Sequence, residues 1–137
     1  MQYIGYMELT YSHHSIYSLN YHLVIVVARR KKVLTPTILT RCLEISSDIA
    51  RMFKSEVAEA SGEEDHIHIL LSAPPDFNAC RFVNSLKTVT SRRVRSEFPE
   101  IRQHLWKDKF WSPSYFIVTT GEAPMETIKQ YIENQGA

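Results

Sequence analysis

Seven consecutive residues at positions 65–71, Asp-His-Ile-His-Ile-Leu-Leu, constrain the fold of this chain more than any other stretch. The run is mostly apolar, follows Gly62 and is closed by two prolines, which predicts a strand buried in a sheet. Because side chains alternate between the faces of a strand, His66 and His68 share one face and the isoleucines point to the other. The strand therefore presents two imidazoles together and offers an apolar surface to helices.

The paired histidines have two interpretations. Neutral imidazole is the commonest side-chain metal ligand, and a strand holds two of them accurately, which indicates a metal site that lacks at least one further ligand. Alternatively, His66 and His68 are hydrogen-bonded structural residues, since a His-x-His pattern also occurs by chance. The pattern alone does not separate the two.

The elements around this strand predict the fold class. Hydrophobic periodicity and turn signals predict a strand at 21–28, a helix at 36–54, a strand at 55–60, a turn at Ser61-Gly62, the histidine strand, a helix at 76–98, a strand at 114–120 and a helix at 124–135. Residues 1–19 have no clear period and predict an arm or an extra strand. The order βαββαβ predicts an α+β protein with a ferredoxin-like antiparallel sheet and a C-terminal helix, in one domain over residues 1–137.

Composition limits the cellular setting. Two cysteines far apart, Cys42 and Cys80, argue against a disulfide framework and favour a reducing compartment. The longest strictly apolar run, residues 23–28, is too short to cross a bilayer, and the first residues do not resemble a signal peptide. We therefore expect a cytoplasmic protein with no membrane contact.

Basic residues are concentrated in two places although the net charge is only +1. Four follow the first strand, where they could also be a solvated strand end, and five lie on the helix at 76–98. These candidates for phosphate contacts are Arg29, Arg30, Lys31, Lys32, Arg81, Lys87, Arg92, Arg93 and Arg95. Aromatic residues alternate with lysines at 106–111, which suits stacking of unpaired bases beside phosphates, although such aromatics more often close a core.

The last helix supplies a second group of polar candidates. Tyr131 and Gln135 are four residues apart, so they lie on one face, one turn from each other. If that face meets the histidines, Gln135 can offer an amide oxygen to a metal and Tyr131 a phenol. The alternative is that Tyr131 packs with Ile128 and Ile132 in an amphipathic docking face.

Three blocks in series resemble a known family. The blocks at 65–71, at 111–116 (Trp-Ser-Pro-Ser-Tyr-Phe) and at 131–135 (Tyr-Ile-Glu-Asn-Gln) are similar to those of the TnpA-type transposases of prokaryotic insertion sequences, the single-tyrosine members of the HUH endonucleases. The resemblance implies that His66, His68 and Gln135 bind a metal and that Tyr131 is the nucleophile. It also implies Mg²⁺ as the cofactor, although two imidazoles suit Mn²⁺ as well.

The resemblance further implies a substrate and an assembly. The substrate would be single-stranded DNA with a hairpin, cut and rejoined through a 5′-phosphotyrosine. The protein would be a homodimer in which the last helix can complete either the active site of its own subunit or that of the partner. The alternatives are a domesticated HUH nuclease that processes genomic hairpins, a short relaxase or replication initiator, a non-catalytic ferredoxin-like nucleic-acid-binding module, and a metal site that only joins a dimer.

Overall fold

The computed structural model describes residues 3–4, 7–8, 10–11, 16–17, 19–119 and 125–135. Its centre is a four-stranded antiparallel sheet in the order β6-β7-β5-β8. These strands are β5 (Leu19–Val26), β6 (Glu56–Glu63), β7 (His66–Ala73) and β8 (Phe116–Thr119). The predicted α+β class with an antiparallel sheet is thereby confirmed.

The residues before the sheet form two short antiparallel pairs. β1 (Tyr3–Ile4) pairs with β2 (Met7–Glu8), and β3 (Thr10–Tyr11) pairs with β4 (Ile16–Tyr17). These pairs form separate two-stranded sheets, so the residues described between 3 and 17 add no strand to the central sheet.

Local signals set the helix starts. The structure contains η1 (Ala28–Arg30), α1 (Pro36–Met52), α2 (Ala79–Glu97), η2 (Pro99–His104) and α3 (Met125–Asn134). Thr35 caps α1 by accepting a hydrogen bond from the Ile38 N–H, and Asn78 caps α2 through the Arg81 N–H. None of the helices in the described ranges has the length and apolar character needed to span a bilayer.

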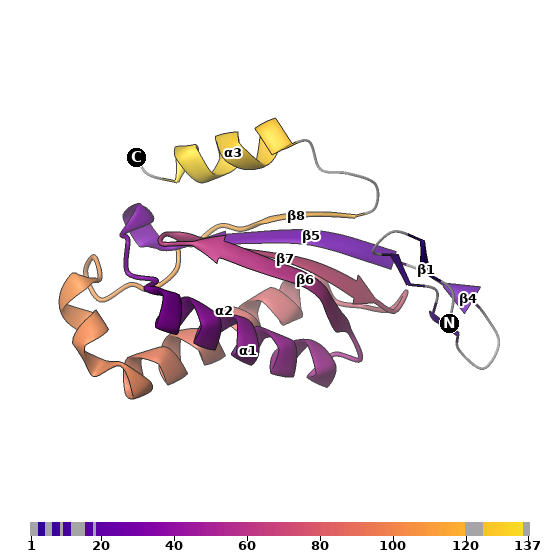
Figure 1. Cartoon of the computed structure of the whole chain (residues 1–137), viewed down its shortest axis with the longest axis horizontal. Helices are drawn as coiled ribbons and strands as arrows, with labels where there is room; N and C mark the ends of the chain where they lie inside the picture. Colours follow the sequence, from indigo (N-terminus) through magenta and orange to yellow (C-terminus); the bar gives the residue numbers. More distant parts are fainter. Residues whose placement is uncertain are drawn as a thin grey trace.

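The two faces of the sheet are covered unequally. α1 and α2 lie on one face, and α3 lies alone on the other (Figure 1). Ile67, Ile69 and Leu71 are buried on the α1–α2 side in the main core. On the opposite side, Val24 and Val26 of β5 form a small separate cluster with residues of α3 and β8. The sheet thus has a thick core on one face and a thin one on the other.

The turn predicted at Ser61-Gly62 is wrong. Both residues belong to β6, which continues to Glu63, and the chain turns at residues 64–65. Gly62 pairs with Ile67 in the ladder, and a Cβ atom placed there would lie 2.6 Å from the His66 carbonyl oxygen. The glycine is therefore required by close backbone approach within the sheet rather than by a turn.

Candidate active site

The imidazoles of β7 lie on the α3 face of the sheet, as the alternation predicts. His68 is the cross-strand partner of Val24 and His66 that of Val26, and directly opposed residues share a face. Tyr131 of α3 packs against the same two valines. The structure thus places the two histidines and the tyrosine on one side of the sheet.

An ion-pair network fixes His66. Asp65 is 5% exposed, its Oδ1 lies 2.8 Å from His66 Nδ1, and its Oδ2 accepts a 3.0 Å hydrogen bond from Arg30 Nε. Burial opposes ionisation of Asp65, but the hydrogen bonds from His66 and Arg30 outweigh it and hold the pKa of this carboxyl below its usual value. Because Asp65 takes Nδ1, His66 can ligate a metal only through Nε2, an arrangement typical of metal-binding histidines.

His68 has a different neighbour. His22 of β5 approaches it, with 3.2 Å between His22 Nδ1 and His68 Nε2 and the rings stacked at 5.4 Å. Both side chains line a cavity of about 350 Å³ together with Glu59 and three other residues. Burial, reinforced by the two nearby histidines, lowers the pKa of His68, so this imidazole is the neutral form that a metal requires. His22 was not among the site residues predicted from the sequence. The available signal was its position directly after Tyr21, at the start of the strand predicted at 21–28.

A polar cluster holds the functional face of α3. The Tyr131 hydroxyl lies 3.0 Å from Ser114 Oγ, while Gln135 Oε1 accepts hydrogen bonds from Ser112 Oγ at 2.7 Å and Ser114 Oγ at 3.0 Å. Burial raises the pKa of Tyr131, and the Ser114 hydrogen bond only partly offsets this. The resting phenol is therefore protonated at neutral pH. Within the described residues, the hydrogen bonds of Tyr131 and Gln135 go to these serines and not to the histidines.

Ser112 and Ser114 are functional candidates that the sequence analysis did not single out. They flank Pro113 in the segment that leads into β8, and Ser112 is buried. The Ser112 N–H also donates to the Val26 carbonyl at 2.7 Å, which joins this segment to the end of β5. The available signals were two hydroxyls separated by a proline immediately before a strand, and their place in the block at 111–116 that resembles the transposase family.

Lys87 of α2 anchors this serine segment. Its Nζ donates to the carbonyl oxygens of Ser112 at 2.8 Å and Ser114 at 3.0 Å, and it lies 5.6 Å from the Tyr115 ring centre. Burial lowers the pKa of Lys87. In this structure Lys87 bridges two backbone carbonyls, and its phosphate contact stays a prediction.

The acidic turn before β7 extends the set of metal ligands that the structure offers. Oxygen or nitrogen atoms of Glu63, Asp65 and His66 all lie within 4.8 Å of one another. Mixed imidazole and carboxylate donors suit Mn²⁺ and Mg²⁺. Asp65 is already bound to Arg30 and to His66 Nδ1, so Glu63 is the further carboxylate donor near His66. The residues present therefore fit a divalent cation near His66, and the sequence analysis did not identify Glu63.

Arg29, Lys31 and Lys32 after β5 are exposed, whereas Arg30 is the partner of Asp65. The exposed cations that follow β5 remain accessible to a phosphate group. The predicted cluster of four therefore divides into three surface charges and one positioning residue.

The basic residues of α2 do not form one surface. Arg81, in the first turn, lies about 21 Å along the helix from Arg95 in the last turn. Arg95 is largely buried and bonds to Ser91 and the Asp108 carbonyl, and Arg93 lies 3.8 Å from Glu97. Arg92 is exposed.

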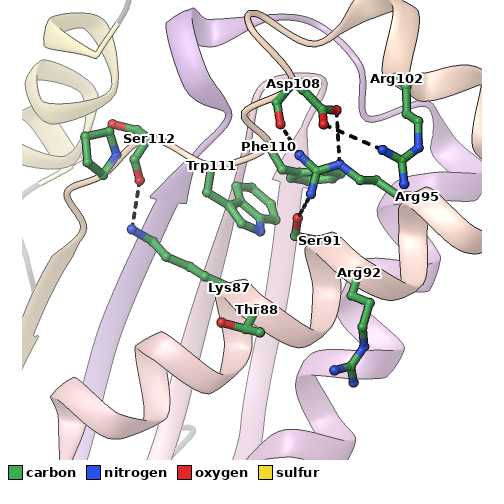
Figure 2. A pocket seen from close by; sticks show the side chains of 11 residues that line it. Lys87, Thr88, Ser91, Arg92, Arg95, Arg102, Asp108, Phe110, Trp111 and Ser112 are labelled. Atoms are coloured by element: carbon green, nitrogen blue, oxygen red, sulfur yellow. Dashed lines mark hydrogen bonds and ion pairs between the residues drawn. The ribbon is translucent and has the colours of Figure 1, made fainter.

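Figure 2 shows a basic cavity beside this helix, with a volume of about 570 Å³. Lys87, Arg92, Arg95 and Arg102 contribute its cations, and Asp108 its single acidic side chain. Arg95 and Arg102 both point to Asp108, with nitrogen–oxygen distances of 3.5 and 3.6 Å, whereas Arg92 extends away from them (Figure 2). Of these four cations, Arg92 is the one best placed for a phosphate.

Comparisons with known proteins agree on one class, the transposases of insertion sequences. The chain is 37% identical over 120 residues to the ISDra2 transposase TnpA of Deinococcus radiodurans, which covers 88% of this chain and 86% of that protein. It is 25% identical over 122 residues to the transposase for insertion sequence element IS200 of Salmonella typhimurium, covering 89% and 80% of the two chains.

Comparisons with solved structures indicate the same class of protein. A Deinococcus radiodurans R1 crystal structure described as a transposase superposes with a TM-score of 0.86 at 34% identity, covering 93% of this chain and 98% of that one. A REP-associated tyrosine transposase bound to a REP hairpin has the same fold, with a TM-score of 0.55 at 13% identity, covering 90% and 68%. Residues 15–135 match the family model for IS200-like transposases, and the chain belongs to this family.

Proposed function

We propose that this transposase cuts and rejoins single-stranded DNA through a covalent bond to Tyr131, with His66 and His68 holding a divalent cation. One observation carries the proposal: the two imidazoles and the tyrosine lie on the same face of the sheet, over Val24 and Val26. The residues fit Mg²⁺ or Mn²⁺, and Gln135 is the third protein ligand in the proposal.

The cation would polarise the scissile phosphate and neutralise charge that develops on its oxygens. The Tyr131 oxygen attacks phosphorus, the bond from phosphorus to the 3′ oxygen breaks, and the products are a 5′-phosphotyrosine and a free 3′-hydroxyl. The phenol loses its proton and the departing 3′ oxygen gains one, so the step neither consumes nor releases a net proton. Rejoining is the reverse attack by a 3′-hydroxyl and needs no external energy source.

The serine cluster has a definite part in this proposal. Ser112 and Ser114 hold the Gln135 amide oxygen, and Ser114 holds the Tyr131 hydroxyl, so both groups face the serine segment at rest. For Gln135 to ligate a cation, its amide oxygen must give up the hydrogen bonds from the serine hydroxyls and bind the metal instead. Ser112 and Ser114 are accordingly positioning residues.

The test is covalent capture of DNA. The protein is incubated with labelled single-stranded hairpin DNA and Mg²⁺ or Mn²⁺, and adducts are resolved on a denaturing gel. We expect an adduct that disappears with EDTA and in Tyr131→Phe. Tyr115→Phe is the matched control, because Tyr115 is half-buried in the neighbouring segment and should keep the adduct. An adduct that survives in Tyr131→Phe would overturn the assignment.

The homodimer and its composite sites form a separate part of the proposal. Mixing His66→Ala protein with Tyr131→Phe protein gives mixed dimers in which one site has both functional groups if helix and histidines come from different subunits. Recovery of adduct in the mixture, when each variant alone gives none, is the result expected of composite sites; no recovery would assign helix and histidines to one subunit, the arrangement in which α3 packs on Val24 and Val26 of its own chain. Size-exclusion chromatography that shows only monomer would contradict the homodimer.

A further inference from the structure

We propose that Trp106, with Arg29, Lys107 and Lys109 around it, binds an unpaired nucleotide of the DNA strand; these four residues are called the Trp106 platform below. The base would stack on the indole and the cations would contact the phosphate. This inference rests on the proposed function for its substrate, and it assigns a place on the surface where that substrate is held.

The geometry of the platform is unusual. Arg29 Cζ lies 4.1 Å from the Trp106 ring centre, Lys107 Nζ 4.8 Å and Lys109 Nζ 5.6 Å. The described residues have five such contacts of a cation with an aromatic ring, and three of the five are on this ring. Three on a single ring therefore mark a concentration of positive charge rather than chance packing.

The charge of the platform is not neutralised within the protein. In the parts of the chain that the structure describes, none of its three cations has a carboxylate oxygen within 4.0 Å. Asp108 lies between the two lysines in sequence, but Arg95 and Arg102 take both of its carboxylate oxygens. A phosphate group would supply the missing counter-charge.

The other aromatics of this segment have different environments. Phe110 is 3% exposed and Trp111 is 8% exposed, and the Trp111 Nε1–H donates to Thr90 Oγ1 at 2.9 Å. Both belong to the core that closes against α2. Trp106 is half-buried, which leaves it as the tryptophan that a ligand can reach.

Backbone strain is concentrated at the same place. Among the residues that the structure describes, five non-glycine residues have positive φ, and four of them, Arg29, Arg30, Lys107 and Asp108, lie in the two segments that meet at Trp106. Such conformations are unfavourable for residues with a side chain and persist where surrounding structure enforces them. The two segments are shaped to bring their cations to one indole.

The platform adjoins the histidine site. The Val27 N–H donates to the Asp65 carbonyl at 2.8 Å, and the Ala28 N–H donates to the Phe110 carbonyl at 2.9 Å. Arg30 follows Arg29 directly and holds Asp65, the partner of His66. A DNA strand whose phosphate lies at His66 therefore passes a base-stacking surface at this edge of the sheet.

Tryptophan fluorescence provides a direct test, because the chain has two tryptophans and the second is buried. The titration uses Tyr131→Phe protein in EDTA, so that no cleavage takes place. One probe is a hairpin with a single-stranded flank, and the other is the same hairpin without the flank. We expect only the flanked hairpin to quench the fluorescence. We expect this quenching to be lost in the double variant that carries both Tyr131→Phe and Trp106→Phe. Equal quenching by both hairpins, or quenching that persists without Trp106, would overturn the proposal.

Affinity gives a second measurement. Replacing Trp106 by Leu should weaken binding of the flanked hairpin about tenfold or more, the usual effect of losing one base stack. Arg29→Gln and Lys109→Gln should each lower the salt dependence of binding by about 0.7 in log–log slope. Lys54→Gln, an exposed lysine beyond the end of α1, is the matched control and should change neither. If Trp106→Leu does not fold, the quenching titration of Trp106→Phe decides alone.

The two proposals fail differently. Quenching at Trp106 without any adduct in the unsubstituted protein would keep the platform and remove the tyrosine nuclease. An adduct without quenching would keep the nuclease and place the flank elsewhere.

Discussion

Replacing Lys87 by Met should destabilise the protein and detach the serine segment from α2. The methionine keeps the apolar stem but cannot donate to the Ser112 and Ser114 carbonyls, which now receive hydrogen bonds of 2.8 and 3.0 Å. Hydrogen bonds to a charged group contribute about 1.5–3 kcal/mol each, but water can replace the lysine at the more exposed Ser114 carbonyl. We therefore expect a loss of about 2 kcal/mol for the pair.

This loss converts into a measurable shift in melting temperature. At about 2.1 cal/mol/K per residue, the unfolding entropy of 137 residues is about 0.29 kcal/mol/K, which gives a decrease in Tm of about 7 °C. Because the same segment carries the hydroxyls that hold Tyr131 and Gln135, adduct formation should fall as well. Differential scanning calorimetry and the denaturing gel measure the two effects.

Arg92→Met is the matched control for this prediction. Arg92 lies on the same helix, is exposed and lines the same cavity as Lys87. Its replacement should leave Tm unchanged and reduce the salt slope of DNA binding by about 0.7–0.9. If Lys87→Met instead leaves Tm unchanged and reduces that slope, then Lys87 contacts phosphate and the bridging role is wrong.

Two further predictions concern Gly62 in β6 and Asp65 in the turn that follows this strand. Gly62→Ala should cost about 1–3 kcal/mol, because its Cβ would meet the His66 carbonyl oxygen at 2.6 Å and Leu39 Cδ1 at 2.8 Å; urea unfolding checks this against Ser61→Ala, and equal midpoints would contradict it. Since the folded-state pKa of Asp65 is depressed, its ionised form stabilises the fold above about pH 4, and this contribution is lost as the pH falls through the folded pKa. In EDTA, Asp65→Asn should be less stable than the unsubstituted protein at neutral pH and lose less stability on acidification, whereas parallel stability–pH curves would refute the linkage.

Local sequence signals predicted the elements well, since their causes are local. Thr35 and Pro36 mark the start of α1 through a side-chain cap and a fixed φ, and neither depends on the rest of the fold. The alternation of β7 likewise assigned His66 and His68 to one face without knowledge of the partner strand. Gly62 was misread because a glycine that avoids a clash and a glycine that makes a turn look the same in sequence.

The roles of individual side chains depended on contacts that sequence spacing does not contain. Lys87 and Arg92 fall on one helix and both predict phosphate binding, yet one meets carbonyls 25 and 27 residues away and the other faces solvent. Trp106 and Trp111 lie five residues apart in the same aromatic stretch, but only Trp111 enters the core. These differences arise from contacts between segments that are distant in the sequence. The sequence therefore identified the candidate residues but did not indicate which of them face solvent and which contact the rest of the fold.

The thin core under α3 divides the molecule into two levels of cooperativity. In the described part of that helix, Tyr131 and Ile132 are the apolar side chains that pack on Val24 and Val26, and the main core lies wholly on the other face of the sheet. Among the side chains that the structure describes, opening of α3 exposes those of Val24, Val26, Phe116, Tyr131 and Ile132 and leaves the main core between α1, α2 and the sheet intact. Backbone amide hydrogens of α3 should exchange with deuterated solvent through this local opening, whereas those of β5 and β7 should exchange only when the whole protein unfolds. The helix with the proposed nucleophile can thus change position at a small fraction of the free energy that maintains the fold.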